Sequence, residues 1–293
     1  MKVKKYFKIL IYPLLFPGCL SAGISSEITG PVAIHLKYPV VLAHGFGVHD
    51  RGKTVKSWGR IPDMLKEKGI DVFFGYTDAW GDFDTNAEIL KTAIDKILHD
   101  TKKEKVNIIA HSKGGLDSRY LIWKYDYGDK IASLTTISTP HHGAEISDLL
   151  YSRKGMHTKT TMRFFLMMET IFNDKNPDMY TANYQLTTEH MKKFNEKVTM
   201  DDRVYYWCIY STMNKPSDDA LLSGIYRYLK RTAGENDGIV SEWSARWGNN
   251  ISKIEGGISH AYIIDYNKRK KLSSTVIPDL YFGIVNELSK KGF

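Results

Sequence analysis

Residues 106–115 read VNIIAHSKGG, a pattern that predicts a strand turning directly into a helix. The apolar run at 106–110 is typical of a buried strand, and apolar side chains at helical spacing follow Ser112 directly. A serine at such a turn needs small residues two positions away on each side, because the chain passes close to itself. Ala110 and Gly114 meet this need. The stretch therefore predicts a nucleophile elbow that exposes the Ser112 hydroxyl above the carboxyl edge of a sheet, the alternative being a plain turn with a capping serine.

The chain on both sides of this turn alternates strands and helices. Apolar runs predict further strands at 40–43, 70–76, 131–137, 203–211 and 251–255, and helical spacing predicts helices at 57–68, from 85 onward and at 275–288. We expect Thr85 to cap its helix, with Glu88 as its capping-box partner. Strands that are apolar throughout predict a parallel sheet covered on both faces. No composition break marks a second domain, so residues 24–293 are expected to form one α/β domain.

A serine hydroxyl needs a base to act as a nucleophile. In this architecture the order along the chain is serine, acid, histidine, and three of the ten histidines lie well beyond the elbow. His157 and His190 fall in a variable insertion, whereas His260 lies in a glycine-rich loop after an expected strand. We therefore expect His260 to be the base, the alternative being a surface histidine.

The acid must lie between Ser112 and His260. Asp237 stands alone in the turn NDG at 236–238, and a turn is well suited to hold an acid that orients the Nδ1 atom of a histidine. We expect Asp237 to fill this role, the alternative being a surface turn. Its competitors occur in charged pairs, Asp201 with Asp202 and Asp218 with Asp219.

The backbone N–H groups of Phe46 and Lys113 are the expected oxyanion hole. One donor belongs to the residue after the nucleophile, and the other comes from a loop after an early strand. That loop is HGFG at 44–47, whose glycines let the Phe46 N–H turn inward. The alternative is that these glycines serve the bend alone.

Residues 144–200 break the alternation and predict a helical insertion. Their stretch 162–172 is apolar on all sides and rich in methionine. Such a helix must be buried or meet lipid, so it is either a core helix of a cap or a lid over an acyl groove, where methionine suits irregular ligands.

Residues 1–23 have the build of an export signal, with early lysines, a short apolar stretch and then small residues. The apolar stretch is too short for a membrane span. We expect cleavage and secretion, or a lipid anchor on Cys19 at the cell surface; a buried N-terminal strand is the alternative. Cys208 then has no partner for a structural disulfide.

The basic balance of the chain, +8, is partly a property of this leader. Lys2, Lys4, Lys5 and Lys8 lie there without an acid, which leaves 8 − 4 = +4. The run KRKK at 268–271 has no interleaved aromatic residues and is typical of a solvated helix flank. We therefore expect no nucleic-acid partner.

Taken together, six blocks resemble the secreted bacterial triacylglycerol lipases of the α/β-hydrolase superfamily, above all the Pseudomonas and Burkholderia group and its clostridial relatives. The blocks are YPVVLAHGFG, VNIIAHSKGGLDSRYL, TTISTPHHGAE, QLTTEHMKKFN, ENDGIVS and ISHAYIIDYN. They cover most of residues 38–267. The resemblance implies an α/β-hydrolase fold, the catalytic residues Ser112, Asp237 and His260, the oxyanion donors Phe46 and Lys113, and a mobile lid before the ENDG loop.

The chain departs from that pattern near the nucleophile. Ala110 replaces a glycine, as in small Bacillus lipases, and His142 stands where arginine is common. Lys113 stands where glutamine or methionine is usual and brings a cation beside the nucleophile.

A second departure concerns metals. Tyr262 stands where the family has an acidic calcium ligand, two residues after the catalytic histidine. Asp219 and Asp265 could rebuild an oxygen-rich calcium site. No spacing predicts zinc, because the adjacent His141 and His142 suit a loop better than a tetrahedral site. No cofactor is expected to be required.

The expected function is that of a monomeric serine hydrolase that cleaves carboxylic esters of lipids through an acyl-enzyme, acting on a lipid or other ester at a lipid–water interface. One alternative is a short-chain or polyester carboxylesterase with the same site. The alternative from another class is a non-catalytic lipid-binding protein of hydrolase fold, which would normally lack one member of the triad.

Overall fold

A computed structural model describes residues 34–50, 57–151, 178–266 and 277–293. The strands within these ranges form one sheet in the order β2-β1-β3-β4-β5-β6, and each neighbouring pair is parallel. They are β1 (Val40–Ala43), β2 (Val72–Phe74), β3 (Val106–His111), β4 (Ile131–Ile137), β5 (Tyr205–Ser211) and β6 (Ile251–Ile254). The predicted parallel sheet is confirmed.

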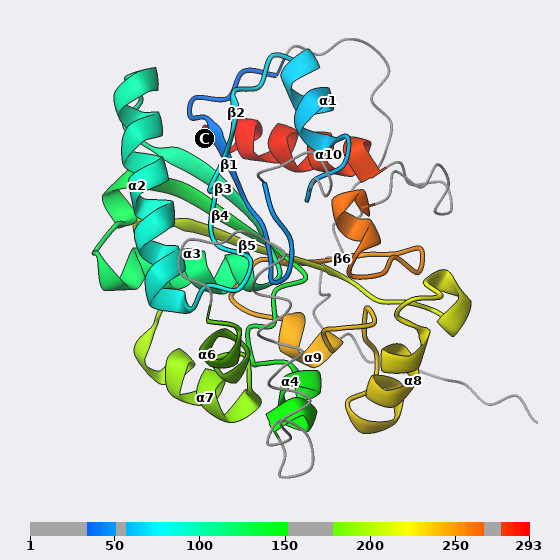
Figure 1. The fold of residues 1–293 in the computed structure, drawn as a ribbon. Helices are drawn as coiled ribbons and strands as arrows, with labels where there is room; N and C mark the ends of the chain where they lie inside the picture. Colours follow the sequence, from blue (N-terminus) through cyan, green and yellow to red (C-terminus); the bar gives the residue numbers. More distant parts are fainter. Residues whose placement is uncertain (1–33, 51–56, 152–177, 267–276) are drawn as a thin grey trace, which may run out of the picture.

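Helices cover both faces of this sheet, because strand side chains alternate between them. Val40 and Leu42 belong to the core beneath α1 and α10, whereas Val41 and Ala43 belong to the core beneath α2 and α3. Figure 1 shows α1 and α10 on one side of the sheet and α2 and α3 on the other. The bounds are α1 (Ile61–Glu67), α2 (Phe83–Thr101), α3 (Lys113–Lys124) and α10 (Ile277–Lys290).

Further helices follow the carboxyl ends of β4 and β5. In Figure 1, α4, α6, α7 and α9 gather below the sheet, with α8 to their right. They are α4 (Glu145–Tyr151), α6 (Met179–Tyr184), α7 (Thr188–Lys197), α8 (Ser223–Thr232) and α9 (Glu242–Ala245), and short 3-10 turns lie at Gly128–Lys130, Pro216–Asp218 and Tyr262–Ile264. The predicted apolar stretch at 162–172 lies outside the described residues. None of the helices described is long and apolar enough to cross a membrane.

Helix α1 begins later than the predicted 57–68. Gly59 has φ +47°, a left-handed conformation that a helix does not continue. A Cβ atom on Gly59 would lie 2.3 Å from the carbonyl oxygen of Asp265, so a close chain contact fixes this turn. The buried Trp58 before it packs edge-on against Tyr281 of α10, with ring centroids 6.0 Å apart.

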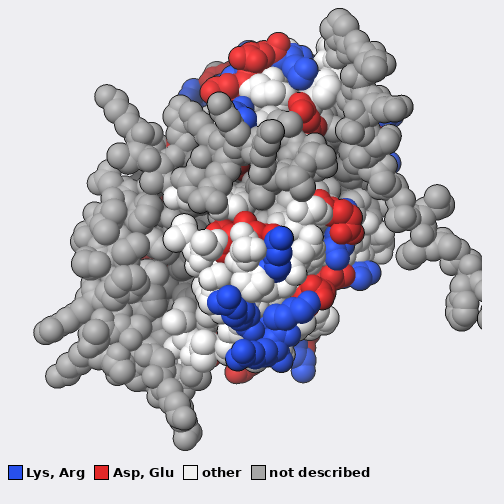
Figure 2. All heavy atoms as spheres, turned by 90° about the vertical axis from the view of Figure 1, so that its right-hand side faces the viewer, with Lys and Arg blue, Asp and Glu red and all other residues white. Residues whose placement is uncertain are grey.

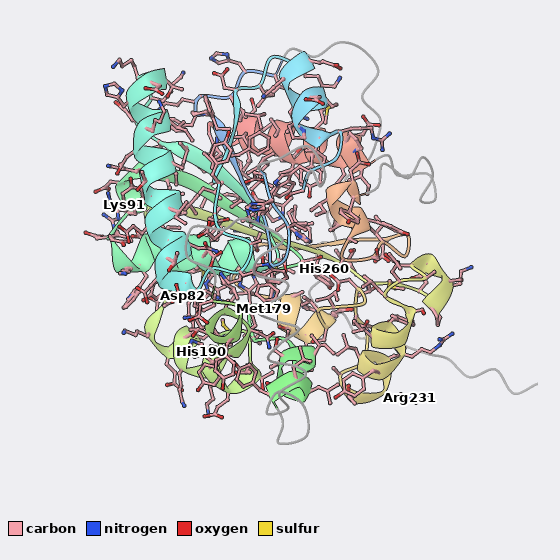
Figure 3. All side chains as sticks on the ribbon, viewed as in Figure 1. Asp82, Lys91, Met179, His190, Arg231 and His260 are labelled. Carbon is pink, nitrogen blue, oxygen red and sulfur yellow. The ribbon has the colours of Figure 1, made fainter. Side chains whose placement is uncertain are left out.

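The prediction that Thr85 caps the second helix is wrong. Helix α2 begins at Phe83, and the Asp82 carboxylate accepts a hydrogen bond from the Thr85 backbone N–H at 2.7 Å. Asp82 is therefore the N-cap, since its side chain satisfies an amide that has no partner within the helix. Figure 3 shows Asp82 at the lower end of α2.

Replacing the true cap should weaken α2, whereas replacing Thr85 should not. We expect Asp82→Ala to lower the free energy of unfolding by about 1 kcal/mol. Thr85→Ala should leave it nearly unchanged, because only the backbone N–H of Thr85 takes part and alanine favours a helix interior. Urea denaturation of both variants checks this, and a larger loss in Thr85→Ala would contradict the assignment.

Candidate active site

Ser112 lies at the turn between β3 and α3 with φ 52° and ψ −129°, a strained conformation for a residue with a side chain. The chain passes so close to itself here that a Cβ on Gly114 would lie 2.4 Å from the His44 carbonyl oxygen. A Cβ on Gly45 would lie 2.7 Å from the Cβ of Ser112. The chain is therefore so crowded at the predicted elbow that positions 45 and 114 require glycine.

Hydrogen bonds from neighbouring segments hold the strained turn in place. The Ser112 N–H donates to the Ile137 carbonyl at 2.9 Å, and the Ser112 carbonyl accepts from the Thr139 hydroxyl at 2.8 Å. Ile137 ends β4, so the turn is fixed to the adjacent strand. Because α3 begins at Lys113, the serine lies at the N-terminal end of this helix, where the helix dipole favours negative charge.

Asp237 and His260 form a hydrogen-bonded pair. The Nδ1 atom of His260 lies 2.8 Å from Asp237 Oδ2, and the His260 N–H donates to the Asp237 carbonyl at 2.9 Å. The other carboxylate oxygen, Oδ1, accepts the N–H groups of Ile239 and Val240 at 3.0 and 2.8 Å. Asp237 is buried, whereas the His260 side chain is 12% exposed. This geometry fixes the ring and leaves its Nε2 atom as the acid–base position.

His111 connects this pair to the elbow. Its Nε2 atom donates to the His260 carbonyl at 3.1 Å, and the two rings lie 4.5 Å apart. Burial, and next the neighbouring His260, hold the pKa of His111 well below its usual range, so its ring stays neutral. No hydrogen bond joins the Ser112 hydroxyl to His260 within the described ranges; catalytic hydrogen bonds often tighten only when substrate binds.

Phe46 lies in the loop after β1, beside the elbow. The N–H of Gly47 donates to the Ala79 carbonyl at 3.0 Å, and the Phe46 ring packs edge-on against Trp80 with centroids 4.7 Å apart. These contacts fix the loop to the segment after β2. The ring of Phe46 and the backbone directly after it are thus anchored.

The expectation of a cation beside the nucleophile is wrong. The ammonium group of Lys113 donates to Asp117, one helical turn along α3, at 2.6 Å, and both side chains are buried. The same ammonium group lies 5.1 Å from the centroid of the Phe83 ring, so its described partners are Asp117 and this ring.

None of the competing acids pairs with His260 in the described structure. Asp201 pairs with Arg203, and Asp218 accepts the N–H groups of Asn214 and Lys215. Asp219 accepts the hydroxyl of Ser259 at 2.8 Å, directly before His260. Sequence reasoning missed this second support of the histidine loop, although Ser259 stands next to His260.

Protein groups bind both of the acids proposed for calcium. Asp219 also accepts the N–H groups of Leu221 and Leu222. Asp265 forms a bidentate ion pair with the Arg60 guanidinium. The described residues contain no group of three side chains arranged to hold a metal ion. Protein donors therefore occupy the carboxylates on which the calcium expectation depended.

The adjacent histidines have separate roles in the packing. His141 lies between the Arg119 guanidinium and the Thr136 hydroxyl, and burial holds its pKa well below the usual range. His142 donates through Nε2 to the Arg246 carbonyl at 3.2 Å. Neither bonds to the proposed catalytic residues.

Removing the Ser259 hydroxyl should loosen the histidine loop. We expect Ser259→Ala to lower the free energy of unfolding, measured by calorimetry, by about 1–3 kcal/mol, because it leaves the buried Asp219 carboxylate short of a donor.

Added calcium should leave the melting temperatures of the wild type and of Ser259→Ala unchanged, because protein groups already bind Asp219 and Asp265. Calorimetry with calcium or with a chelator checks this; a calcium-dependent rise in the wild type would contradict the assignment of Asp219 to protein partners alone.

Comparison with known proteins agrees with this geometry. Triacylglycerol lipase 2 of Saccharomyces cerevisiae is 26% identical, and the match covers 100% of this chain and 96% of that protein. A triacylglycerol lipase of Burkholderia plantarii is 26% identical over 80% of this chain and 81% of that protein. The predicted resemblance to triacylglycerol lipases is confirmed.

Solved structures and a family model agree as well. The mature lipase BlEst2 of Bacillus licheniformis matches with a TM-score of 0.64 and 25% identity, over 90% of this chain and 94% of that one. The metagenomic carboxyl esterase MGS0156 matches in fold with a TM-score of 0.73, at 16% identity over 91% and 80% of the two chains. The family model for palmitoyl protein thioesterase matches residues 39–220. Because that match spans more than half of the chain, the protein belongs to the palmitoyl protein thioesterase family and has the α/β-hydrolase fold.

Proposed function

We propose that the protein is a serine hydrolase that cleaves carboxylic esters of lipids through an acyl-enzyme. Ser112 is the nucleophile, His260 the base and Asp237 the acid that orients it. One observation carries the proposal: a buried carboxylate holds His260 through Nδ1, next to a strained strand-to-helix turn that presents a serine. The relatives named above, lipases and a carboxyl esterase, support ester cleavage as the reaction.

In the acylation step, the Ser112 oxygen attacks the ester carbonyl carbon while His260 Nε2 takes the hydroxyl proton. Asp237 keeps the proton of His260 on Nδ1, so Nε2 starts as an acceptor. The imidazolium that forms is stabilised by the same carboxylate. His260 then gives its proton to the departing alcohol oxygen, and the carbonyl re-forms as an ester to Ser112.

In the second half of the reaction, water attacks the acyl-enzyme. His260 takes a proton from the water as its oxygen bonds to the acyl carbon. When the tetrahedral intermediate collapses, the bond to the Ser112 oxygen breaks, and His260 returns the proton to that oxygen as the carboxylic acid is released. Both halves pass through an oxyanion. We assign its stabilisation to the N–H groups of Phe46 and Lys113; one such donor is typically worth about 10²–10³ in rate.

Residues 144–200 are proposed to cover an acyl groove as a lid. Their described helices expose Leu149, Tyr180 and Tyr184, which are more than one-third accessible. Lipid-facing surfaces expose side chains of this kind. Action at a lipid–water interface belongs to the same proposal.

Monomeric state and export belong to this proposal too, the latter through residues 1–23 or a lipid on Cys19. A nucleic-acid partner is not part of it. Figure 2 shows Lys and Arg beside Asp and Glu on the face that carries α8. Lys230 of α8 pairs with Glu235, and Lys253 pairs with Glu242. Acids thus neutralise these two lysines, which does not favour binding of a nucleic acid.

Replacing the nucleophile tests the reaction directly. We expect Ser112→Ala to reduce kcat at least about 10⁴-fold on chromogenic esters of short and long acyl chains, because the attacking oxygen is lost. Ser289→Ala, which removes an exposed hydroxyl bonded to the His35 carbonyl, is the control and should keep full activity. Undiminished turnover by Ser112→Ala would sink the proposal. Wild-type activity confined to short acyl chains would favour the carboxylesterase alternative.

The acid is tested by a matched pair of aspartates. Asp237→Asn should lower kcat by about 10⁴-fold, because the amide no longer fixes the required tautomer of His260. Asp218→Asn, which alters a turn without contact to His260, should change kcat less than about twofold. Equal effects in the two variants would show that Asp237 has no special role.

A further inference from the structure

The side chain of Lys113 begins a buried polar chain that the proposed mechanism leaves unused. Its ammonium group donates to Asp117 Oδ1 at 2.6 Å, and the other oxygen of Asp117 accepts from the Asn86 side-chain amide at 3.0 Å. All three side chains are buried. Charged side chains are rarely buried, and burying them costs free energy even when they are paired. A buried ion pair at the start of α3 therefore calls for a structural or functional explanation.

Asn86 carries the chain across to the segment after β2. Its Oδ1 atom accepts the Asp78 N–H at 2.9 Å, and its Nδ2 atom donates to the Asp78 carbonyl at 3.0 Å. The fit is tight, because a Cβ on Gly81 would lie 2.4 Å from Asn86 Oδ1. Asn86 thus holds the backbone of residues 78–81 against α2.

That segment in turn holds the loop with Phe46. The Ala79 carbonyl accepts the Gly47 N–H at 3.0 Å, and the Trp80 ring packs against the Phe46 ring. A Cβ on Gly47 would lie 2.8 Å from the Trp80 ring. A continuous set of contacts therefore runs from Lys113 through Asp117 and Asn86 to the backbone next to Phe46.

We propose that Asp117 is a positioning residue of the oxyanion hole, which sets the spacing between the backbone N–H groups of Lys113 and Phe46. One of its carboxylate oxygens binds the Lys113 ammonium group. The other binds Asn86, which holds the segment that anchors the Phe46 loop. The inference depends on the proposed function, because it assigns a task to the same site. Asp117 touches no reacting atom.

The electrostatics agree with a fixed geometry. Burial raises the pKa of the Asp117 carboxyl, and the neighbouring ammonium and amide groups oppose that rise. A buried carboxylate with two strong donors has few alternative arrangements. An apolar residue at position 113 would have no donor for the acid, and glutamine would have no charge to pair with it, so this ion pair depends on a lysine at that position.

The test compares oxygen esters with thionoesters in Asp117→Asn. The C=S sulfur accepts hydrogen bonds weakly, so a thionoester gains little from the oxyanion hole. We expect kcat for the oxygen ester to fall about 10–100-fold with KM nearly unchanged. The thionoester rate should fall much less, so the ratio of the two rates drops. A melting curve separates this effect from lost stability.

Asp95→Asn is the matched control. Lys91 and Asp95 form an i,i+4 pair of similar length, 2.7 Å, on α2, and Figure 3 shows Lys91 pointing away from the sheet. This variant should lose stability without a change in the oxygen-to-sulfur ratio. If Asp117→Asn behaves in the same way, or if both ester types fall equally, the proposal is overturned.

A second variant covers the case in which Asp117→Asn does not fold. Lys113→Met with Asp117→Leu removes both charges together, which proteins tolerate better than one unpaired buried charge. It cuts the link to Asn86 and should lower the oxygen-to-sulfur ratio as well; an unchanged ratio overturns the proposal. Failure of the proposed function is a separate result, seen as wild-type turnover that survives Ser112→Ala.

Discussion

The close pass between the Ser112 turn and the loop after β1 is the constraint on which the rest of the site depends. β1 and β3 are parallel neighbours with Ala43 opposite Ala110, so both chains leave the sheet at the same edge. Gly45 and Gly114 have no room for a side chain there. The serine hydroxyl and both proposed oxyanion amides therefore arise from two segments in van der Waals contact.

Buried carboxylates hold the loops at this edge of the sheet in fixed positions. Asp237 binds His260 and two amides of its own turn, and Asp219 binds Ser259 and the amides before α8. Asp117 does the same for Lys113 and Asn86. Each carboxylate is satisfied by protein donors, as buried charge requires. The site is in this sense preorganised, and such order lets fixed dipoles stabilise a developing charge.

Much of this could be predicted from the sequence, because apolar strands and glycine spacing report directly on backbone geometry. The parallel sheet followed from runs such as 131–137, and the hydrogen bond between Asp237 and His260 joins two residues singled out from turn chemistry and chain order. Their catalytic roles stay predictions.

The rest depended on contacts between distant segments, which local patterns do not report. Asp82 outranks Thr85 as a cap because the chain before α2 is extended at Asp82, not at Thr85. The direction of the Lys113 side chain depends on a partner at i+4 and on Asn86 from another helix. Asp219 and Asp265 were considered as calcium ligands because the sequence does not show their contacts. In the structure, Asp219 accepts the hydroxyl of Ser259, and Asp265 pairs with Arg60.

The central claim is that one serine at a strained turn forms a covalent acyl intermediate. The decisive measurement is to label the purified protein with an alkyl fluorophosphonate and to analyse the digested chain by mass spectrometry. We expect one label per chain, on the peptide that contains Ser112. A label on another residue, or a fully folded protein that takes up none, would contradict it.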